Sequence, residues 1–161
     1  MGTEIERKFL MKNDDWKAHV TETHLIKQGY LQSGLDPSQK SSVRIRISNK
    51  QANINVKSAE LSAVRQEYEY DIPLHDAEQM LMTLCSGAII EKTRYYVPYG
   101  SHLWEIDIFS GANTGLEMAE IELSRLDEHF EHPDWLGAEV SSDERYYNNY
   151  LVKTPYSNWS V

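Results

Sequence analysis

Polar and apolar residues alternate with a period of two along most of the chain, and clusters of Gly, Pro, Asn and Ser interrupt this alternation. The period is typical of β-strands with two different faces, whereas few segments show the longer period of a helix. The pattern therefore predicts a β-rich chain of about eight strands. The expected strands span residues 3–10, 27–32, 42–48, 52–58, 65–71, 91–98, 102–109 and 117–123.

Three short helical signals fall between or after these strands. Asn13 or Asp14 can cap a helix that runs to Val20, an apolar-periodic stretch follows Pro73 as far as residue 85, and a third signal covers residues 141–151. We expect these helices to cover the strands. The length suits a single core, and no linker or repeat is evident, so one domain is expected over residues 1–161.

Charged side chains occupy one face of most expected strands. The first strand places Glu4, Glu6 and Lys8 on one face and Ile5 and Phe9 on the other. Two arrangements explain such a pattern: a sheet packed on helices with its charges outward, or a closed barrel with its charges inward. The alternation alone does not choose between them.

The charges are also segregated by sign. The all-positive pairs are Arg44/Arg46 and Lys92/Arg94, and the all-negative pairs are Glu67/Glu69 and Glu120/Glu122. A solvated face usually mixes both signs, and like charges two residues apart repel unless a counter-ion lies between them. Segregation therefore favours the barrel with an inward charged face.

The two kinds of pair suit two kinds of ligand. Carboxylate oxygens are the ligands that Mg²⁺ and Mn²⁺ prefer, and guanidinium and ammonium groups bind polyphosphates. Together they indicate metal-assisted phosphoryl transfer, although the Gly-rich phosphate loop of many nucleotide-binding proteins is missing.

Composition narrows the classes of partner and the cellular setting. The chain has 16 Lys and Arg against 25 Asp and Glu, a formal net charge of -9, which argues against nonspecific binding to nucleic acid or to anionic membranes. Cys85 is the only cysteine, and no apolar run is long enough for a signal peptide or a membrane span. We therefore expect a cytoplasmic protein.

The segment Glu4-Ile5-Glu6-Arg7-Lys8 resembles the Glu-x-Glu-x-Lys signature of the CYTH superfamily, the triphosphate tunnel metalloenzymes. The further segments that carry the resemblance are, in order, Arg44-Ile45-Arg46, Lys57, Glu67-Tyr68-Glu69, Lys92-Thr93-Arg94, Trp104-Glu105-Ile106-Asp107 and Ala119-Glu120-Ile121-Glu122-Leu123. The resemblance extends to Arg145-Tyr146-Tyr147-Asn148 and so spans nearly the whole chain. It implies a mainly β, α+β fold: an eight-stranded antiparallel closed barrel with a charged interior and a few covering helices.

The resemblance also implies a role for each group of residues. A Mg²⁺ or Mn²⁺ site would fall on Glu4, Glu6, Glu120 and Glu122. A triphosphate clamp would fall on Lys8, Arg44, Arg46, Lys57, Lys92 and Arg94, with Glu67, Glu69 and Asp107 orienting these cations by ion pairs. Tyr30 and Lys8 are the candidate catalytic residues, Tyr30 for proton transfer, and Arg145 is placed to reach a terminal phosphate.

Small bacterial inorganic triphosphatases are the closest part of the family. The resemblance implies hydrolysis of inorganic triphosphate to pyrophosphate and phosphate by a monomer or homodimer. Alternatives from the same fold are a class IV adenylate cyclase, which makes cyclic AMP from ATP, and a thiamine triphosphatase. An alternative of another class is a non-catalytic module that binds polyphosphate or nucleotides, although such a module gains little from four glutamates in its cavity.

Overall fold

Eight antiparallel strands close into a barrel in the computed structural model, which describes residues 2–60 and 62–160 of the chain. The strands of the barrel are β1 (Gly2–Met11), β2 (Glu22–Gln32), β3 (Ser41–Ser48), β4 (Gln51–Ser58), β5 (Val64–Ile72), β6 (Ser86–Tyr99), β7 (His102–Ser110) and β8 (Glu117–Glu122). They follow one another around the barrel in the order β5-β4-β3-β2-β6-β7-β8-β1. Every expected strand overlaps one of them, and the predicted fold class is confirmed.

The barrel closes where its first strand meets β5. Gly2 pairs with Glu67 and Ile5 with Val64, so that β1 lies between β5 and β8. A short additional strand, β9 (Leu136–Glu139), pairs with the second half of β1 and was not expected from the sequence. Closure satisfies the backbone groups that an open sheet would leave at its edges.

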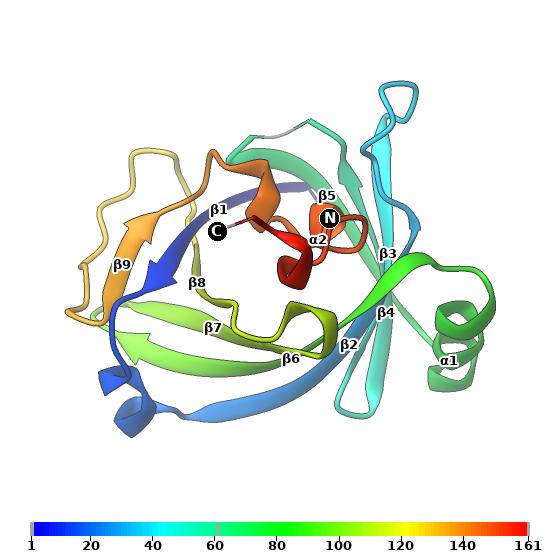
Figure 1. Cartoon of the computed structure of the whole chain (residues 1–161). Helices are drawn as coiled ribbons and strands as arrows, with labels where there is room; N and C mark the ends of the chain where they lie inside the picture. Colours follow the sequence, from blue (N-terminus) through cyan, green and yellow to red (C-terminus); the bar gives the residue numbers. More distant parts are fainter. Residues whose placement is uncertain (1, 61, 161) are drawn as a thin grey trace.

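The apolar face of the strands points outward and is covered in part by helices and turns, in agreement with an inward charged face. Helix α1 (Leu74–Thr83) lies outside the barrel beside β3 and β4, where its Ala77 and Leu81 pack against Ile45 (Figure 1). The 3-10 turn η1 (Asp15–His19) buries Trp16 in a second outer cluster with Trp104. These contacts remove much of the apolar face from water, while the polar face lines the interior.

The C-terminal segment fills one end of the barrel. Its parts are η3 (Glu144–Tyr146), α2 (Asn148–Leu151) and η4 (Tyr156–Asn158), and the segment lies within the ring of strands in Figure 1. Leu151 is fully buried in a cluster with Tyr30, Phe109 and Met118, next to the turn η2 (Gly111–Asn113). An apolar plug therefore closes the barrel at this end.

The expected helix over residues 141–151 is broken in two. Tyr147, between η3 and α2, has an extended backbone, with φ -85° and ψ 142°, and its hydroxyl donates a hydrogen bond to the carbonyl oxygen of Ser141 at 2.8 Å. The turn that this bond stabilises interrupts the helical path. In the part of the chain that the structure describes, no helix has the length and apolar character needed to cross a membrane.

Candidate active site

A cavity of about 390 Å³ occupies the barrel interior, and charged side chains dominate its wall. Because side chains alternate along a strand, the same period that sends Phe9 outward sends Glu4, Glu6 and Lys8 inward. The carboxylates on the wall are Glu4, Glu6, Glu67, Glu69, Asp71, Glu105, Glu120 and Glu122, and the cations are Lys8, Arg44, Arg46, Lys57, Arg65 and Arg94. Among the described residues, carboxylates thus outnumber cations on this wall.

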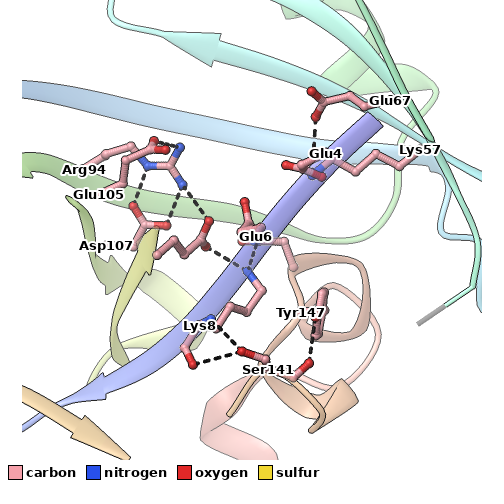
Figure 2. A network of polar contacts seen from close by, with 12 residues as sticks. Glu4, Glu6, Lys8, Lys57, Glu67, Arg94, Glu105, Asp107, Ser141 and Tyr147 are labelled. Atoms are coloured by element: carbon pink, nitrogen blue, oxygen red, sulfur yellow. Dashed lines mark hydrogen bonds and ion pairs between the residues drawn. The ribbon is translucent and has the colours of Figure 1, made fainter. Parts of the chain in front are cut away.

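The first and last strands of the barrel meet at Lys8. Its register partner is Glu120, and the Lys8 ammonium lies 2.9 Å from a carboxylate oxygen of Glu120 and 3.1 Å from one of Glu6 (Figure 2). Burial by itself would lower the pKa of Lys8, but the charges of Glu120 and Glu6 raise it well above its ordinary value. Lys8 is therefore held as a cation between two carboxylates.

A second group of ion pairs joins β1, β4 and β5. The Lys57 ammonium lies 2.9 Å from Glu4 and 3.6 Å from Glu67. The buried amide of Asn55 donates hydrogen bonds to Glu67 at 3.1 Å and to Glu69 at 2.9 Å. Arg44 pairs with Glu69 at 3.5 Å, so Glu67 and Glu69 each contact a cation of the expected clamp.

The third group lies on β6 and β7, where Asp107 accepts from two cations. Its carboxylate oxygens are 2.7 Å from the Lys92 ammonium. They also lie 2.7 Å from Arg94 Nε, and Arg94 contacts Glu105 at 2.6 Å (Figure 2). The Lys92 and Asp107 side chains are fully buried and stand behind the cavity wall rather than on it. Burial outweighs the opposing charge of Asp107 and, with the neighbouring charge of Arg94, lowers the pKa of Lys92 to about 7.

The four glutamates expected to bind a metal do converge on the cavity, and their charges act on one another. Burial and the charge of Glu120 raise the pKa of Glu6, and burial and the charge of Glu4 raise that of Glu122. Such a donor set of hard oxygens with surplus negative charge fits a divalent cation. The side chains are not yet gathered around a metal position, because no three acidic, histidine or cysteine side chains in residues 2–60 and 62–160 are close enough to form one. The ammonium groups of Lys8 and Lys57 hold three of these glutamates instead.

Of the two remaining predicted site residues, Tyr30 lies on the cavity wall and Arg145 lies outside it. Tyr30 lines the cavity next to Arg44, its partner on β3, and is 6% exposed. Arg145 does not line the cavity: its guanidinium lies 2.7 Å from Asp143 and over the ring of Trp159. The break of the expected helix at Tyr147 directs that residue, rather than Arg145, toward the interior.

Several residues of the cavity and its supports were not singled out from the sequence. They are Gln28, Asn55, Arg65, Tyr96, Glu105 and Tyr147. Most of them share the period-two phase of a predicted site residue on the same strand, as Glu105 does with Asp107 and Asn55 with Lys57. That phase is the signal that could have identified them, whereas their partners depend on the register between strands.

Comparison with known proteins identifies relatives over almost the whole chain. The family model of the CYTH domain matches residues 2–149. The inorganic triphosphatase of Acetivibrio thermocellus is 42% identical over 159 residues, which cover 99% of each chain. The inorganic triphosphatase of Nitrosomonas europaea is 37% identical over 155 residues, which cover 93% of this chain and 97% of the relative.

Solved structures share the same barrel. The crystal structure of an inorganic triphosphatase matches with a TM-score of 0.64 and 32% identity, over 92% of this chain and 97% of that one. A putative adenylyl cyclase from Hippeastrum, described as revealing a dominant triphosphatase activity, matches with a TM-score of 0.54 and 14% identity, over 78% of this chain and 80% of that one. The second likeness is one of fold.

Proposed function

The chain belongs to the CYTH domain family, and from this premise we propose that it hydrolyses inorganic triphosphate to pyrophosphate and phosphate with the help of a divalent metal ion. The observation that carries the proposal is the cavity itself, whose wall combines carboxylates and cations inside a closed barrel. The inorganic triphosphatases that are 42% and 37% identical to the chain support the same substrate.

In this proposal Glu4, Glu6, Glu120 and Glu122 hold Mg²⁺ or Mn²⁺. A bound divalent ion supplies charge neutralisation and Lewis-acid activation of phosphate oxygens. The charge of the wall favours such an ion, because a triphosphate anion on its own would meet more carboxylates than cations. The surplus negative charge around Glu6 and Glu122 would be neutralised as the ion binds.

Five of the six clamp cations line the cavity and bind and orient the triphosphate: Lys8, Arg44, Arg46, Lys57 and Arg94. Lys92 stands behind the wall and supports the clamp through Asp107, which also holds Arg94. Most of them are already fixed by ion pairs, so little reorganisation is needed when substrate enters, and catalysis is mainly positioning and electrostatic stabilisation. Lys8 lies between the carboxylate and cationic parts of the wall and contributes charge at the reacting phosphate.

Tyr30 is the proposed proton-transfer residue. Its side chain lines the cavity next to Arg44, its register partner on β3, so its hydroxyl can reach a ligand bound there. Replacement of Tyr30 by Phe should lower kcat with little change in KM, because the ring is kept while the hydroxyl is lost. A raised KM with an unchanged kcat would assign the hydroxyl to substrate binding instead.

A substrate panel tests the proposal. Inorganic triphosphate, ATP, thiamine triphosphate and pyrophosphate are incubated with Mg²⁺ or Mn²⁺, and both phosphate release and cyclic AMP are measured. We expect inorganic triphosphate to give the highest kcat/KM. Cyclic AMP as the main product from ATP would contradict the proposal in favour of a cyclase, and absence of any turnover would favour a binding module.

The double variant Glu120→Gln, Glu122→Gln tests the metal site. Loss of two metal ligands should lower metal-dependent turnover by about 100-fold or more. Glu117→Gln is the matched control, since Glu117 lies on the same strand but does not line the cavity. Unchanged phosphate release from the double variant would show that the metal assignment is wrong.

The setting proposed for this activity is the cytoplasm, with a monomer or homodimer that does not bind nucleic acid. The formal net charge of -9 supports the last point, because phosphate backbones repel an acidic protein. Light scattering coupled to size exclusion measures the oligomeric state, and fractionation of the source cells locates the protein.

A further inference from the structure

One of the six clamp cations differs from the other five in what holds it. The five that form ion pairs are Lys8 with Glu120 at 2.9 Å, Arg44 with Glu69 at 3.5 Å, Lys57 with Glu4 at 2.9 Å, Lys92 with Asp107 at 2.7 Å and Arg94 with Asp107 at 2.7 Å. Arg46 lines the same cavity but forms no ion pair with any residue of the described chain. Its positive charge is therefore not matched by a carboxylate of its own.

The residue that holds Arg46 is the neutral side chain of Gln28. Gln28 and Arg46 are register partners on β2 and β3, and Arg46 Nε donates a hydrogen bond to Gln28 Oε1 at 2.7 Å. Gln28 is fully buried and does not line the cavity, whereas Arg46 does. The amide thus holds the guanidinium through Nε, and the two terminal nitrogens form no hydrogen bond with any residue in the described part of the chain.

The surroundings of Arg46 disfavour the charged form of its guanidinium when no anion is bound. Burial, together with the nearby charges of Arg44 and Arg94, lowers the pKa of Arg46 to about 9. The group still carries its proton at neutral pH. An anion that enters the cavity would relieve the repulsion among these three guanidinium groups, so Arg46 is the position where phosphate oxygens gain most.

We propose that Gln28 is a positioning residue for phosphate binding, and that its amide fixes the Arg46 guanidinium without neutralising it. A carboxylate at this position would fix the guanidinium equally well but would cancel the charge that attracts the substrate. The ligand class is the polyphosphate anion, bound through oxygens to the terminal nitrogens of Arg46. The inference rests on the proposed function for its substrate, but its test has a binding readout that does not need turnover.

Two substitutions of Gln28 separate orientation from charge. Gln28→Glu keeps the hydrogen bond and adds the opposing charge, and Gln28→Leu removes the hydrogen bond without adding charge. We expect Gln28→Glu to raise KM for inorganic triphosphate about tenfold or more, and Gln28→Leu to raise it several-fold, with smaller changes in kcat. Calorimetric titration of inorganic triphosphate into each protein in the presence of EDTA should give the same order of affinities.

Two controls exclude effects on folding and on overall charge. Gln39→Glu adds the same charge at a residue outside the cavity, where Gln39 Oε1 accepts a hydrogen bond from the Gly34 amide that a carboxylate would keep. This variant should have the KM of the unmodified protein. In an Arg46→Met background, Gln28→Leu should have no further effect on triphosphate affinity, because the guanidinium that it positions is absent.

The outcomes separate this inference from the proposed function. The inference would be overturned if Gln28→Glu bound triphosphate with the affinity of the unmodified protein. It would also be overturned if Gln28→Leu lowered triphosphate affinity by the same factor in the unmodified and the Arg46→Met backgrounds. If the unmodified protein binds triphosphate but does not hydrolyse it, the proposed function fails, and the calorimetric order of the Gln28 variants still decides the role of Gln28. Absence of triphosphate binding by the unmodified protein, with EDTA and also with Mg²⁺, would overturn the inference and the proposed function.

Discussion

Asp107 shows how strongly a single buried carboxylate can organise the cationic wall. Its side chain is fully buried, and it contacts both Lys92 and Arg94. Burial alone would raise its pKa, but the charges of Arg94 and Lys92 lower it. Asp107 therefore stays ionised and fixes two clamp cations at once, from behind the cavity wall.

Loss of this carboxylate should destabilise the fold. Asp107→Asn leaves two buried cations without their counter-charge, and we expect a cost of about 3 kcal/mol in the free energy of unfolding, measured by urea denaturation. The matched variant Glu69→Gln removes a pair whose carboxylate is 45% exposed and should cost under about 1 kcal/mol. Similar losses in the two variants would contradict this account of Asp107.

Glu128 gives a pH-dependent prediction away from the cavity. Hydrogen bonds from Ser124 and from His102, the latter at 2.5 Å, lower the pKa of Glu128 from 4.5 to about 2. A lowered pKa in the folded state contributes stability above the ordinary pKa, and this contribution is lost as the pH falls toward the lowered value.

Glu128→Gln should therefore lower the melting temperature at pH 7, and the difference from the unmodified protein should shrink as the pH falls from 4.5 toward 2. Melting curves followed by circular dichroism over this range measure the difference. A difference that stays constant with pH would show that the ionised form of Glu128 has no part in the stabilisation.

Among the elements, the C-terminal segment has the clearest separate role. It closes one end of the barrel with Leu151, which is fully buried, and its Asn148 accepts a hydrogen bond from Lys92 at 3.3 Å. The broken helix thus connects the apolar plug to the cationic wall. Gly87 makes close docking possible, because a Cβ at this position would lie 2.5 Å from the carbonyl oxygen of Val152.

Leu151→Ala tests the plug. Truncation of a fully buried leucine should cost about 3 kcal/mol in the free energy of unfolding, and hydrogen exchange of residues 148–160 should rise more than that of the barrel strands. Met82→Ala, at a residue that is 75% exposed on α1, should cost under about 0.5 kcal/mol. Uniform acceleration of exchange over the whole chain would show that the plug is not a separate unit.

At the scale of the whole molecule, the closed barrel places both kinds of charge around one interior. Its wall carries more carboxylates than cations among the described residues, so a triphosphate alone would meet surplus negative charge that a bound divalent ion offsets. Binding of each should therefore favour binding of the other.

This coupling predicts how triphosphate and Mg²⁺, alone and together, change the melting temperature of the protein. Triphosphate with Mg²⁺ should raise the melting temperature by more than the sum of the shifts that each produces alone, with a stabilisation of about 2.7 kcal/mol at a ligand concentration 100 times Kd. Addition of EDTA to the mixture should return the melting temperature to that of triphosphate alone. Additive shifts would contradict the coupling.

Much of this architecture follows from the sequence. A period of two is a local property, since successive side chains of a strand point to opposite faces, and it assigned Arg44 and Glu120 to the face opposite Ile45 and Ile121. Segregation of the charges by sign then favoured the inward face, and the order of the motifs indicated the family. These conclusions need no knowledge of which strand lies beside which.

Only the tertiary structure decided which side chains form ion pairs and hydrogen bonds with one another in the barrel. Lys8 meets Glu120, and Lys57 meets Glu4, only because the barrel closes with a particular register between strands that are far apart in sequence. The same holds for the amide of Gln28 behind Arg46. A short segment such as β9 lacks a periodic signal of its own and forms because β1 offers it backbone partners. The sequence thus determined which residues face the interior, and closure of the barrel determined what each of them contacts there.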